Sequence, residues 1–321
     1  LDKLKWAIEK YRYEYHVLDK SPISPEALDS LKRELVEIET KYPQLITPDS
    51  PSQRVGGAPL PEFKKVTHKI AQWSFNDAFT GEEMREFDAR VKRFLNPRTD
   101  LGEARSVLSP TYTCEHKIDG LKVVLEYERG LLVRAATRGD GTVGEEITEN
   151  VKTIESVPLR LSEPVSVVVE GEVWLKKSTL TELNRAREKT GEEPFANPRN
   201  VAAGSIRQLD PKIAASRKLE CFVYDLALSD AVLPKTQYEE LRYLTELGFK
   251  VNPHFKRCAS IHEVIAYWEE WKGKIKKEGS KNKRRESALF REAKRLEYDY
   301  LIKTGQLKEE TLYGLLNNVR L

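Results

Sequence analysis

The fold is decided by the stretch Cys114-Glu115-His116-Lys117-Ile118-Asp119-Gly120, in which a lysine comes just before a tight Asp-Gly turn. The residues that follow, 121–127, alternate between two faces, which is the period of a half-buried β-strand. Residues 128–130 then turn the chain, and residues 131–137 run back as a partner strand. The sequence therefore predicts an antiparallel hairpin that contains this motif, with Lys117 at the end of an extended segment.

A lysine that is held at a strand end beside carboxylates can act as a nucleophile. It must first lose a proton that a free lysine keeps up to about pH 10.4. Desolvation or a nearby cation lowers that pKa. The isolated pattern K-x-D-G is short enough to recur by chance, however, and on its own it favours a surface lysine before a turn.

Longer strings elsewhere in the chain are far more specific than this motif. They are residues 47–57 (TPDSPSQRVGG), 136–150 (ATRGDGTVGEEITEN), 170–173 (EGEV) and 195–211 (FANPRNVAAGSIRQLDP). In this order and spacing the chain closely resembles the N-terminal adenylation region of bacterial NAD-dependent DNA ligases, over residues 1–272. The shorter K-x-D-G is shared with ATP-dependent ligases and capping enzymes, so it does not choose among them.

The resemblance implies an α+β fold with three parts. Residues 1–60 would form a helical subdomain that binds nicotinamide mononucleotide (NMN), together with its linker. Residues 61–272 would form the nucleotidyltransferase (adenylation) domain, an antiparallel-sheet core of the ATP-grasp-like ligase kind. Residues 273–321 differ from the family and are expected to form a basic, helical tail.

Local patterns in the sequence independently predict several helices. Hydrophobic spacing indicates a helical hairpin over 1–42, with Ser24 as N-cap and Pro25 at the first helical position of its second helix. Strands are expected to dominate 107–226. Further helices are expected at 81–95, 179–190, 236–247 and 261–271, the last two with Ser or Thr caps.

The resemblance also implies a reaction. Lys117 would attack the adenylyl phosphate of NAD, release NMN and keep AMP for the joining of DNA nicks. By motif position the catalytic residues are Lys117, Asp119 and Glu172. Glu172 follows an apolar run and resembles the metal-linked acid that would hold Mg²⁺ at the phosphate.

Several nucleotide-binding residues follow from the same motifs. Glu115 would contact the adenine region, Arg138 the sugar and phosphate, and Arg199 the nucleotide side of its long motif. Ser74 and Phe75 match the segment that edges the adenine pocket. The residue types alone also fit plainer roles: a surface ion pair worth at most about 1 kcal/mol for Glu115, solvent exposure for Arg138, and core packing for Phe75.

The choice of NAD is expected to lie in the N-terminal hairpin. Tyr15, His16 and Asp29 match the positions that grip the NMN half in the family. Without the resemblance, Tyr15 would be a core residue and His16 a solvated helix residue. Arg207, further along the chain, is assigned to contact with the DNA backbone.

Five positions depart from the family pattern. Pro25 and Leu28 stand where the family has Asp and Tyr, which removes an acceptor and a stacking face for NAD. Glu170 replaces an arginine, and this leaves the local charge balance open. His116 and Lys122 replace small or aliphatic residues. Lys122 either brings a cation near Lys117 and lowers its pKa, or is a surface substitution.

The largest departure follows Trp271. A second D-G-x-x-x-K strand and a further lysine motif are absent from the sequence, and a basic run through 272–285 with a helical pattern through 289–300 stands in their place. Because those lysines would stabilise phosphoryl charge, we expect self-adenylation at most, and no full nick sealing by this chain alone.

Two other functions stay open beside the active adenylation module. One is a catalytically inactive ligase remnant that binds nucleotide or nucleic acid. The other is an ATP-dependent nucleotidyltransferase, against which the Tyr15-His16 hairpin speaks.

Composition limits the setting in which the protein works. The 321 residues carry a net charge of only +3, so contact with nucleic acid needs a local basic patch. No apolar run is long enough to span a membrane, and the three scattered cysteines form neither a disulfide framework nor a zinc site. We expect a cytoplasmic monomer without membrane association, acting with NAD and Mg²⁺ on nicked double-stranded DNA in replication and repair, once joined to further ligase domains.

Overall fold

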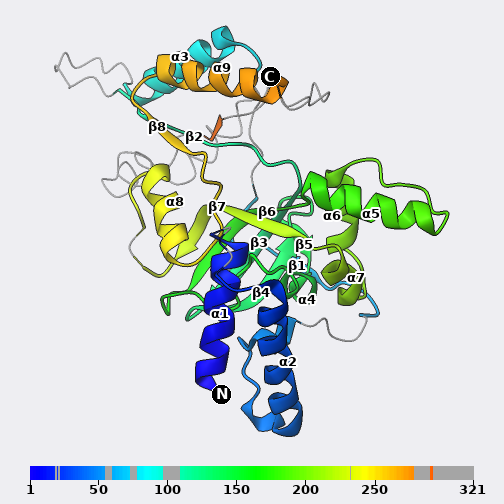
Figure 1. Cartoon of the computed structure of the whole chain (residues 1–321). Coiled ribbons are helices and arrows are strands. Elements are labelled where there is room, and N and C mark those ends of the chain that lie inside the picture. The colour runs from blue at the N-terminus through cyan, green and yellow to red at the C-terminus, as the bar shows by residue number, and fades with distance from the viewer. Residues whose placement is uncertain are drawn as a thin grey trace. The chain divides into compact units, whose positions relative to one another are not determined.

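The computed structural model of the protein describes residues 1–18, 20, 22–54, 60–72, 78–96, 109–231, 233–277 and 290–291. The chain divides into two compact units (Figure 1). Unit 1 comprises Leu1–Trp73, Ile118–Leu233 and Leu241–Asn252, and unit 2 comprises Ser74–Lys117, Pro234–Glu240 and Pro253–Leu321. The chain therefore passes from one unit to the other between Lys117 and Ile118.

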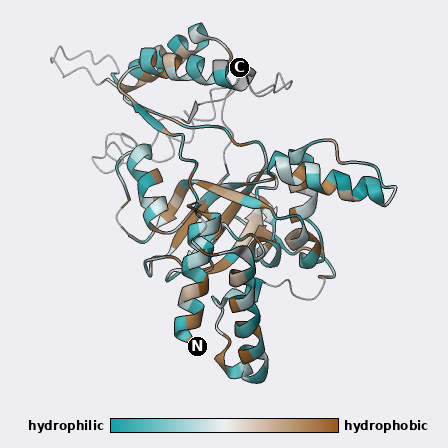
Figure 2. Ribbon diagram, viewed as in Figure 1, coloured by the Kyte–Doolittle hydropathy of each residue, from teal (hydrophilic) through white to brown (hydrophobic). Residues whose placement is uncertain are grey.

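Unit 1 is built on a four-stranded antiparallel sheet in the order β4-β3-β6-β7. Its strands are β3 (Leu121–Glu128), β4 (Leu131–Thr137), β6 (Val167–Trp174) and β7 (Glu220–Ser229). The predicted hairpin is confirmed: Arg129 and Gly130 take positive φ angles of 49° and 80° between β3 and β4. The strands are mainly hydrophobic, whereas helix α5 (Lys177–Lys189) is mainly hydrophilic (Figure 2).

Two details of the expected hairpin were wrong. Strand β3 is not half-buried, because every residue from Val123 to Tyr127 is buried, including the charged Glu126. That carboxylate is held by the guanidinium of Arg134, 2.7 Å away, and by Lys69. The motif also lies outside the hairpin. The preceding strand, β2 (Tyr112–Cys114), ends before the motif, and residues 115–119 have no regular structure.

The helical hairpin of unit 1 is confirmed as α1 (Asp2–His16) and α2 (Pro25–Lys41). Its apolar core is formed by Ile8, Leu28 and Leu35. Ser24 caps α2 as expected, because its hydroxyl accepts a hydrogen bond from the amide of Ala27 at 3.2 Å. The linker that follows contains two short 3₁₀ turns, Pro43–Leu45 and Pro51–Arg54.

Smaller elements complete unit 1. Strand β1 (Lys65–Thr67) pairs antiparallel with β5 (Val143–Glu145), and α4 (Thr148–Lys152) follows. Helices α6 (Pro198–Ile206) and α7 (Pro211–Ser216) were not predicted, since strands were expected to dominate this region. Both carry sequence signals for a start, because Asn197 and Asp210 are N-caps, each followed by a proline.

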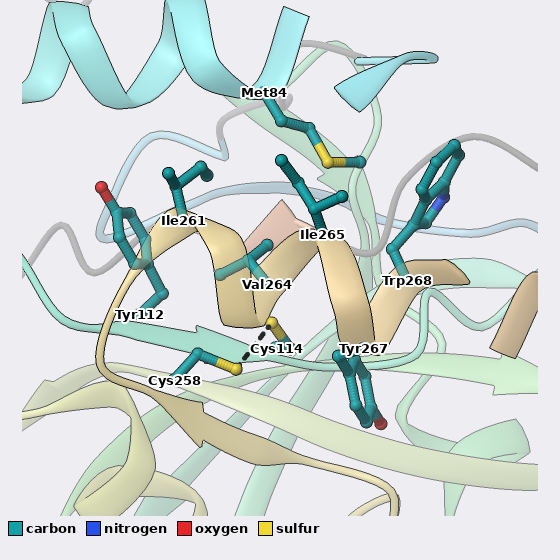
Figure 3. Close-up of a cluster of buried hydrophobic side chains, with 9 residues drawn as sticks. All are labelled: Met84, Tyr112, Cys114, Cys258, Ile261, Val264, Ile265, Tyr267 and Trp268. Carbon is teal, nitrogen blue, oxygen red and sulfur yellow. Dashed lines mark hydrogen bonds between the residues drawn. The ribbon is translucent and has the colours of Figure 1, made fainter. Parts of the chain in front are cut away.

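Unit 2 contains a three-stranded sheet in the order β8-β2-β9. Its elements are α3 (Gly81–Leu95), β2 (Tyr112–Cys114), β8 (Lys256–Cys258), α9 (Ile261–Lys277) and β9 (Phe290–Arg291). Helix α8 (Gln237–Glu246) begins in this unit, where the Thr236 hydroxyl accepts from the amide of Glu239 as predicted. The core of unit 2 joins α3, β2, β8 and α9, and in it the sulfur atoms of Cys114 and Cys258 lie 3.7 Å apart (Figure 3). Burial raises the pKa of both thiols.

The C-terminal tail differs from its prediction where the structure describes it. Helix α9 does not end at Trp271 but continues to Lys277. Residues 290–291, which fall inside the expected helical pattern, form a strand that pairs antiparallel with β2. The rest of the basic run and of the tail beyond 277 lies outside the described residues. Within the described part of the chain, no helix is both long and apolar enough to cross a membrane.

Candidate active site

The residues around the end of the K-x-D-G motif meet the G-E-V string in unit 1. The amide of Gly120 donates to the carboxylate Oε1 of Glu172 at 3.1 Å. The close approach requires glycine, because a Cβ at position 120 would lie 2.0 Å from the carbonyl oxygen of Val173. The neighbouring Asp119 accepts from the guanidinium of Arg199 at 3.2 Å. Three of the predicted residues, Asp119, Glu172 and Arg199, are thus tied to one short segment.

The charge at Glu170 is compensated from the adjacent strand. The ammonium of Lys122 lies 2.6 Å from Oε2 of Glu170, and both side chains are largely buried, at 14% and 8% exposure. This pair joins two of the positions that depart from the family pattern. Lys122 is therefore not the free surface substitution that the sequence left open. Its charge is engaged by an acid on β6.

Arg138 follows β4 in a turn that is held by residues outside every recognised motif. Its side-chain Nε donates to the carbonyl of Gln72 at 3.4 Å. Its own carbonyl lies 3.1 Å from Nε2 of His68, a buried ring. Arg138 is partly buried, so simple solvent exposure beside the Gly-Asp-Gly turn was wrong. No sequence signal marked His68 or Gln72, which lie about seventy residues upstream of the turn.

Arg207, predicted to contact DNA, is engaged in a two-point pair. Its Nε and Nη2 donate to the carboxylate of Glu145 at 2.7 and 3.1 Å. The pair raises the pKa of Arg207 and lies at the surface, with the arginine side chain 54% exposed. An exposed pair of this kind is worth at most about 1 kcal/mol, so a phosphate can compete for the same guanidinium.

The burial of Tyr15 and His16 in the hairpin is the opposite of what their residue types alone suggest. Tyr15 is exposed at 39%, not buried in the core, and His16 is partly buried, not solvated. Burial lowers the pKa of His16 to about 4, with further lowering from the cations Lys32 and Arg12 against the opposing charge of Glu155. The two rings touch edge to face at a centroid distance of 4.8 Å. His16 is thus neutral near pH 7 and can accept as well as donate a hydrogen bond.

The other hairpin positions that bear on NAD binding differ in their exposure to solvent. Asp29, predicted to bind NMN, is exposed on α2. Leu28, which replaces the family's tyrosine, is buried in the hairpin core at 5% exposure. Pro25 is the first residue of α2. The loss of a stacking side chain at Leu28 therefore coincides with a gain of apolar packing between the two helices.

In unit 2, Glu115 is a buried acceptor and not a surface ion pair. It is 8% exposed, and its Oε1 accepts from the side-chain amide of Gln237 at 3.1 Å. Gln237 is the first residue of α8 and is separated from Glu115 by more than one hundred positions, so no local sequence pattern marks this pairing. A carboxylate held by a neutral amide keeps its acceptor character and has a fixed direction.

His116 anchors the same segment to α9. Its ring packs edge to face on Trp271 at 4.1 Å, and its Nε2 lies 3.4 Å from the hydroxyl of Tyr267. Burial, and then the charges of His254 and Lys274, lower the pKa of His116 to about 4. The neutral ring adds no positive charge beside the next residue, Lys117, whose side chain is exposed.

Within the described residues, a magnesium ion could be held by one carboxylate together with substrate phosphates. Among them no group of three or more His, Cys, Asp or Glu side chains could enclose a metal ion. Magnesium in phosphoryl-transfer sites is commonly held by one or two carboxylates together with substrate phosphates. Glu172 offers such a carboxylate. Ser74 and Phe75, predicted to edge the adenine pocket, lie outside the described residues.

Comparison with known protein families covers nearly the whole described chain. The model of the NAD-dependent DNA ligase adenylation domain matches residues 60–279. A second model, the N-terminal NAD⁺-binding domain of DNA ligase-like proteins, matches residues 1–56. The chain belongs to the NAD-dependent DNA ligase adenylation domain family. The first of these matches contains Lys117, Asp119, Glu172 and Arg199, and the second contains the helical hairpin.

Relatives of this adenylation domain are named DNA ligase. Those from Shouchella clausii and Anoxybacillus flavithermus are 48% and 50% identical over 271 and 269 residues, each alignment covering 84% of this chain. The relative from Thermotoga neapolitana is 46% identical over 272 residues, or 85% of this chain. The chain spans 38–39% of the length of these relatives.

Proposed function

We propose that this adenylation domain transfers AMP from NAD to its own Lys117. The proposal rests above all on the contact between Gly120 and Glu172, which links the K-x-D-G motif to the acid of the G-E-V string. It is supported by a family model that runs through both strings. The domains would be those of the sequence analysis, with residues 61–272 as a nucleotidyltransferase core of the ATP-grasp-like ligase kind and residues 1–60 as the NMN-binding part.

The reaction is a displacement at phosphorus. The nitrogen of Lys117 forms a bond to the adenylyl phosphorus, while the bond from this phosphorus to the bridging oxygen breaks. NMN leaves with the electron pair, and the nitrogen releases its proton to water. The protein contributes the position of the two groups and the stabilisation of phosphoryl charge.

We assign roles to the other residues from their motif positions, and their surroundings support these roles. Glu115, held by Gln237, would accept from the adenine amino group. Arg199 and Arg138 would bind sugar and phosphate oxygens, and Asp119 would orient Arg199. Glu172 would hold Mg²⁺, which when bound would offset negative charge on the phosphate.

The hairpin would recognise the NMN half of NAD. The exposed ring of Tyr15 can stack on nicotinamide, and the neutral ring of His16 and the exposed Asp29 can bond to ribose or phosphate oxygens. In the context of a longer ligase, the adenylated domain would pass AMP to nicked duplex DNA, with Arg207 contacting its backbone. We propose that it does so as a monomer in the cytoplasm.

Intact-mass analysis after incubation with NAD and Mg²⁺ tests the proposal. We expect a gain of one AMP with NAD, none with ATP, and none in Lys117→Ala. The matched control is Lys189→Ala, which removes an exposed lysine at the end of α5 and should leave the adduct unchanged. An adduct with ATP only would indicate an ATP-dependent nucleotidyltransferase. No adduct with either donor, from folded protein, would favour the inactive remnant.

A further inference from the structure

We infer that His68 is a positioning residue for adenylation: its side chain fixes the backbone of Arg138, so that the guanidinium of Arg138 is directed to the sugar and phosphate of NAD. The inference rests on the proposed function, because it concerns the residue that we assign to these oxygens. It is carried by the hydrogen bonds around the turn formed by residues 138–144, all of which lie within unit 1.

The ring of His68 makes one hydrogen bond among the described residues. It is 9% exposed, and its Nε2 lies 3.1 Å from the carbonyl oxygen of Arg138. Because a carbonyl oxygen only accepts, the ring must carry a proton on Nε2. The other ring nitrogen, Nδ1, is buried without a hydrogen-bond partner in the part of the chain that the structure describes. The bond to Arg138 is therefore the polar contact that a histidine supplies at this position.

Hydrogen bonds hold the peptide groups on both sides of the Arg138 Cα atom. The amide of Arg138 donates to the carbonyl of Lys122 at 3.3 Å. Its carbonyl accepts from the amide of Gly141 at 3.1 Å as well as from the ring of His68. Because peptide groups are planar, holding both of them sets the direction of the Cα–Cβ bond. Of these three bonds, the one from His68 comes from a side chain, so a substitution can remove it.

The segment that carries His68 is itself anchored on the turn by backbone hydrogen bonds. The amide of His68 donates to the carbonyl of Thr142 at 2.9 Å, and the amide of Gln72 donates to the carbonyl of Gly141 at 2.7 Å. The ring packs closely on the turn, since a Cβ atom at Gly144 would lie 3.1 Å from Nε2 of His68. A polar substitution of His68 should thus leave the segment in place and remove the side-chain bond.

The guanidinium of Arg138 is held only at its inner end. Its Nε donates to the carbonyl of Gln72 at 3.4 Å, which is long for a hydrogen bond of this type. Neither of its Nη groups has a hydrogen-bond partner among the described residues. The outer edge of the guanidinium offers parallel N–H donors that suit phosphate and sugar oxygens. Because the Nε contact is weak, the direction of this edge depends on the backbone of Arg138.

Two substitutions of His68 distinguish this role from general packing. In glutamine the amide nitrogen lies three bonds beyond Cβ, as Nε2 does in histidine, so it can donate to the same carbonyl. In asparagine the amide nitrogen is one bond short. At NAD concentrations well below saturation, we expect single-turnover self-adenylation about tenfold slower in His68→Asn but within about threefold of the wild type in His68→Gln. Equal losses in the two variants would overturn the inference.

The coupling between His68→Asn and Arg138→Ala is the decisive measurement. If His68 acts through the guanidinium of Arg138, its loss has nothing further to disturb once that guanidinium is gone. We therefore expect His68→Asn to slow adenylation less than about twofold in the Arg138→Ala background, whereas independent effects would multiply. Multiplying effects would overturn the inference, and so would an Arg138→Ala variant that adenylates at the wild-type rate.

Val66 supplies the matched control. It is 6% exposed on β1, two residues before His68, and it pairs with Gly144. Val66→Ala should lower thermal stability because it leaves a cavity, but it keeps the bond between His68 and Arg138. The adenylation rate of the folded protein should be unchanged. A rate loss equal to that of His68→Asn would mean that the assay reports damage to this region in general, and the inference would fail.

Amide hydrogen exchange, followed by NMR, separates the inference from the proposed function. The amide of Gly141 shares the Arg138 carbonyl with His68, so it should exchange faster in His68→Asn than in the wild type and in His68→Gln. Unchanged exchange at Gly141 would contradict the inference, whether or not the protein adenylates. Absence of an AMP adduct in the wild type would instead refute the proposed function, and exchange at Gly141 would still decide whether His68 holds the turn.

Discussion

Replacing Arg54 with alanine is expected to loosen the helical hairpin from the rest of unit 1. Arg54 ends the second 3₁₀ turn of the linker and is 6% exposed. Its Nη1 and Nη2 donate to the backbone carbonyls of Ile154 and Val157 at 3.0 and 2.8 Å, and Nη1 also reaches the carbonyl of Lys152. One arginine thus joins the linker to the segment that follows α4.

The same guanidinium is part of a buried group of charges. It lies 3.9 Å from carboxylate oxygens of Glu9 on α1 and of Glu155. Burial alone would raise the pKa of Glu155, but Arg54 and then Lys32 outweigh it and hold that pKa at about 2. Hydrogen bonds to a charged group contribute about 1.5–3 kcal/mol each, and removal of one partner of a buried pair costs about 3–5 kcal/mol.

These contributions overlap, because the same group makes all the contacts. We therefore expect Arg54→Ala to lower the free energy of unfolding of unit 1 by about 4 kcal/mol, and Arg54→Lys by about 2 kcal/mol, since a lysine keeps the charge but lacks the planar fork. The loss is a large fraction of the 5–15 kcal/mol typical of a domain.

Hydrogen exchange with mass spectrometry gives the clearest assay, since it follows the hairpin peptides separately from those of the central sheet. The matched control is Arg160→Ala, which breaks an arginine–carboxylate pair between Asp49 of the same linker and the core. Arg160 is 55% exposed, so its loss should cost at most about 1 kcal/mol. If the amides of the hairpin exchange equally slowly in the two variants, the burial of Arg54 is not what makes it important, and the reasoning is wrong.

Three further outcomes are expected. Gly120→Ala should lower the self-adenylation rate at least tenfold, because the new Cβ would meet the carbonyl of Val173 and push the chain away from Glu172, as a single-turnover assay would register. Asn150→Asp should lower the free energy of unfolding, measured in urea, by about 3 kcal/mol. The side-chain amide of Asn150 donates to the backbone carbonyls of Ile206 and Gln208, each at 2.7 Å, and a carboxylate in its place would face both carbonyls as another acceptor. His16 has a pKa of about 4 in the folded chain and 6.5 in the unfolded chain, so between these values only the unfolded chain binds the proton. The free energy of unfolding should therefore fall by about 2 kcal/mol as the pH drops from 7 to 5. His16→Gln should remove this part of the pH dependence of stability.

Elements with local signals could be predicted from the sequence. The spacing of apolar residues placed the hairpin and α3, and Ser24 and Thr236 cap their helices as expected. Helices α6 and α7 were missed, although Asn197 and Asp210 carry the same kind of signal. Their apolar spacing is too short to stand out, so the cap was the only guide to them.

The residues of the candidate site were predicted mainly from the family resemblance. The resemblance did not indicate which side chains form hydrogen bonds or ion pairs with them. Gln237 orients Glu115 across more than one hundred residues, and Lys122 compensates Glu170 across two strands. Periodicity reports which face a side chain takes but not which charge it will meet there. For the same reason the exposure of Tyr15 could not be foreseen, because it depends on how α1 packs on the rest of unit 1.

The residues on either side of Lys117 are each held within their own unit. On the unit 2 side, Glu115 is bonded to α8 and His116 packs on α9. On the unit 1 side, Asp119 is bonded to α6 and Gly120 to β6. The side chain of Lys117 itself is exposed. We propose that this exposure lets the amine follow the phosphorus as the bond forms, as displacement at phosphorus requires.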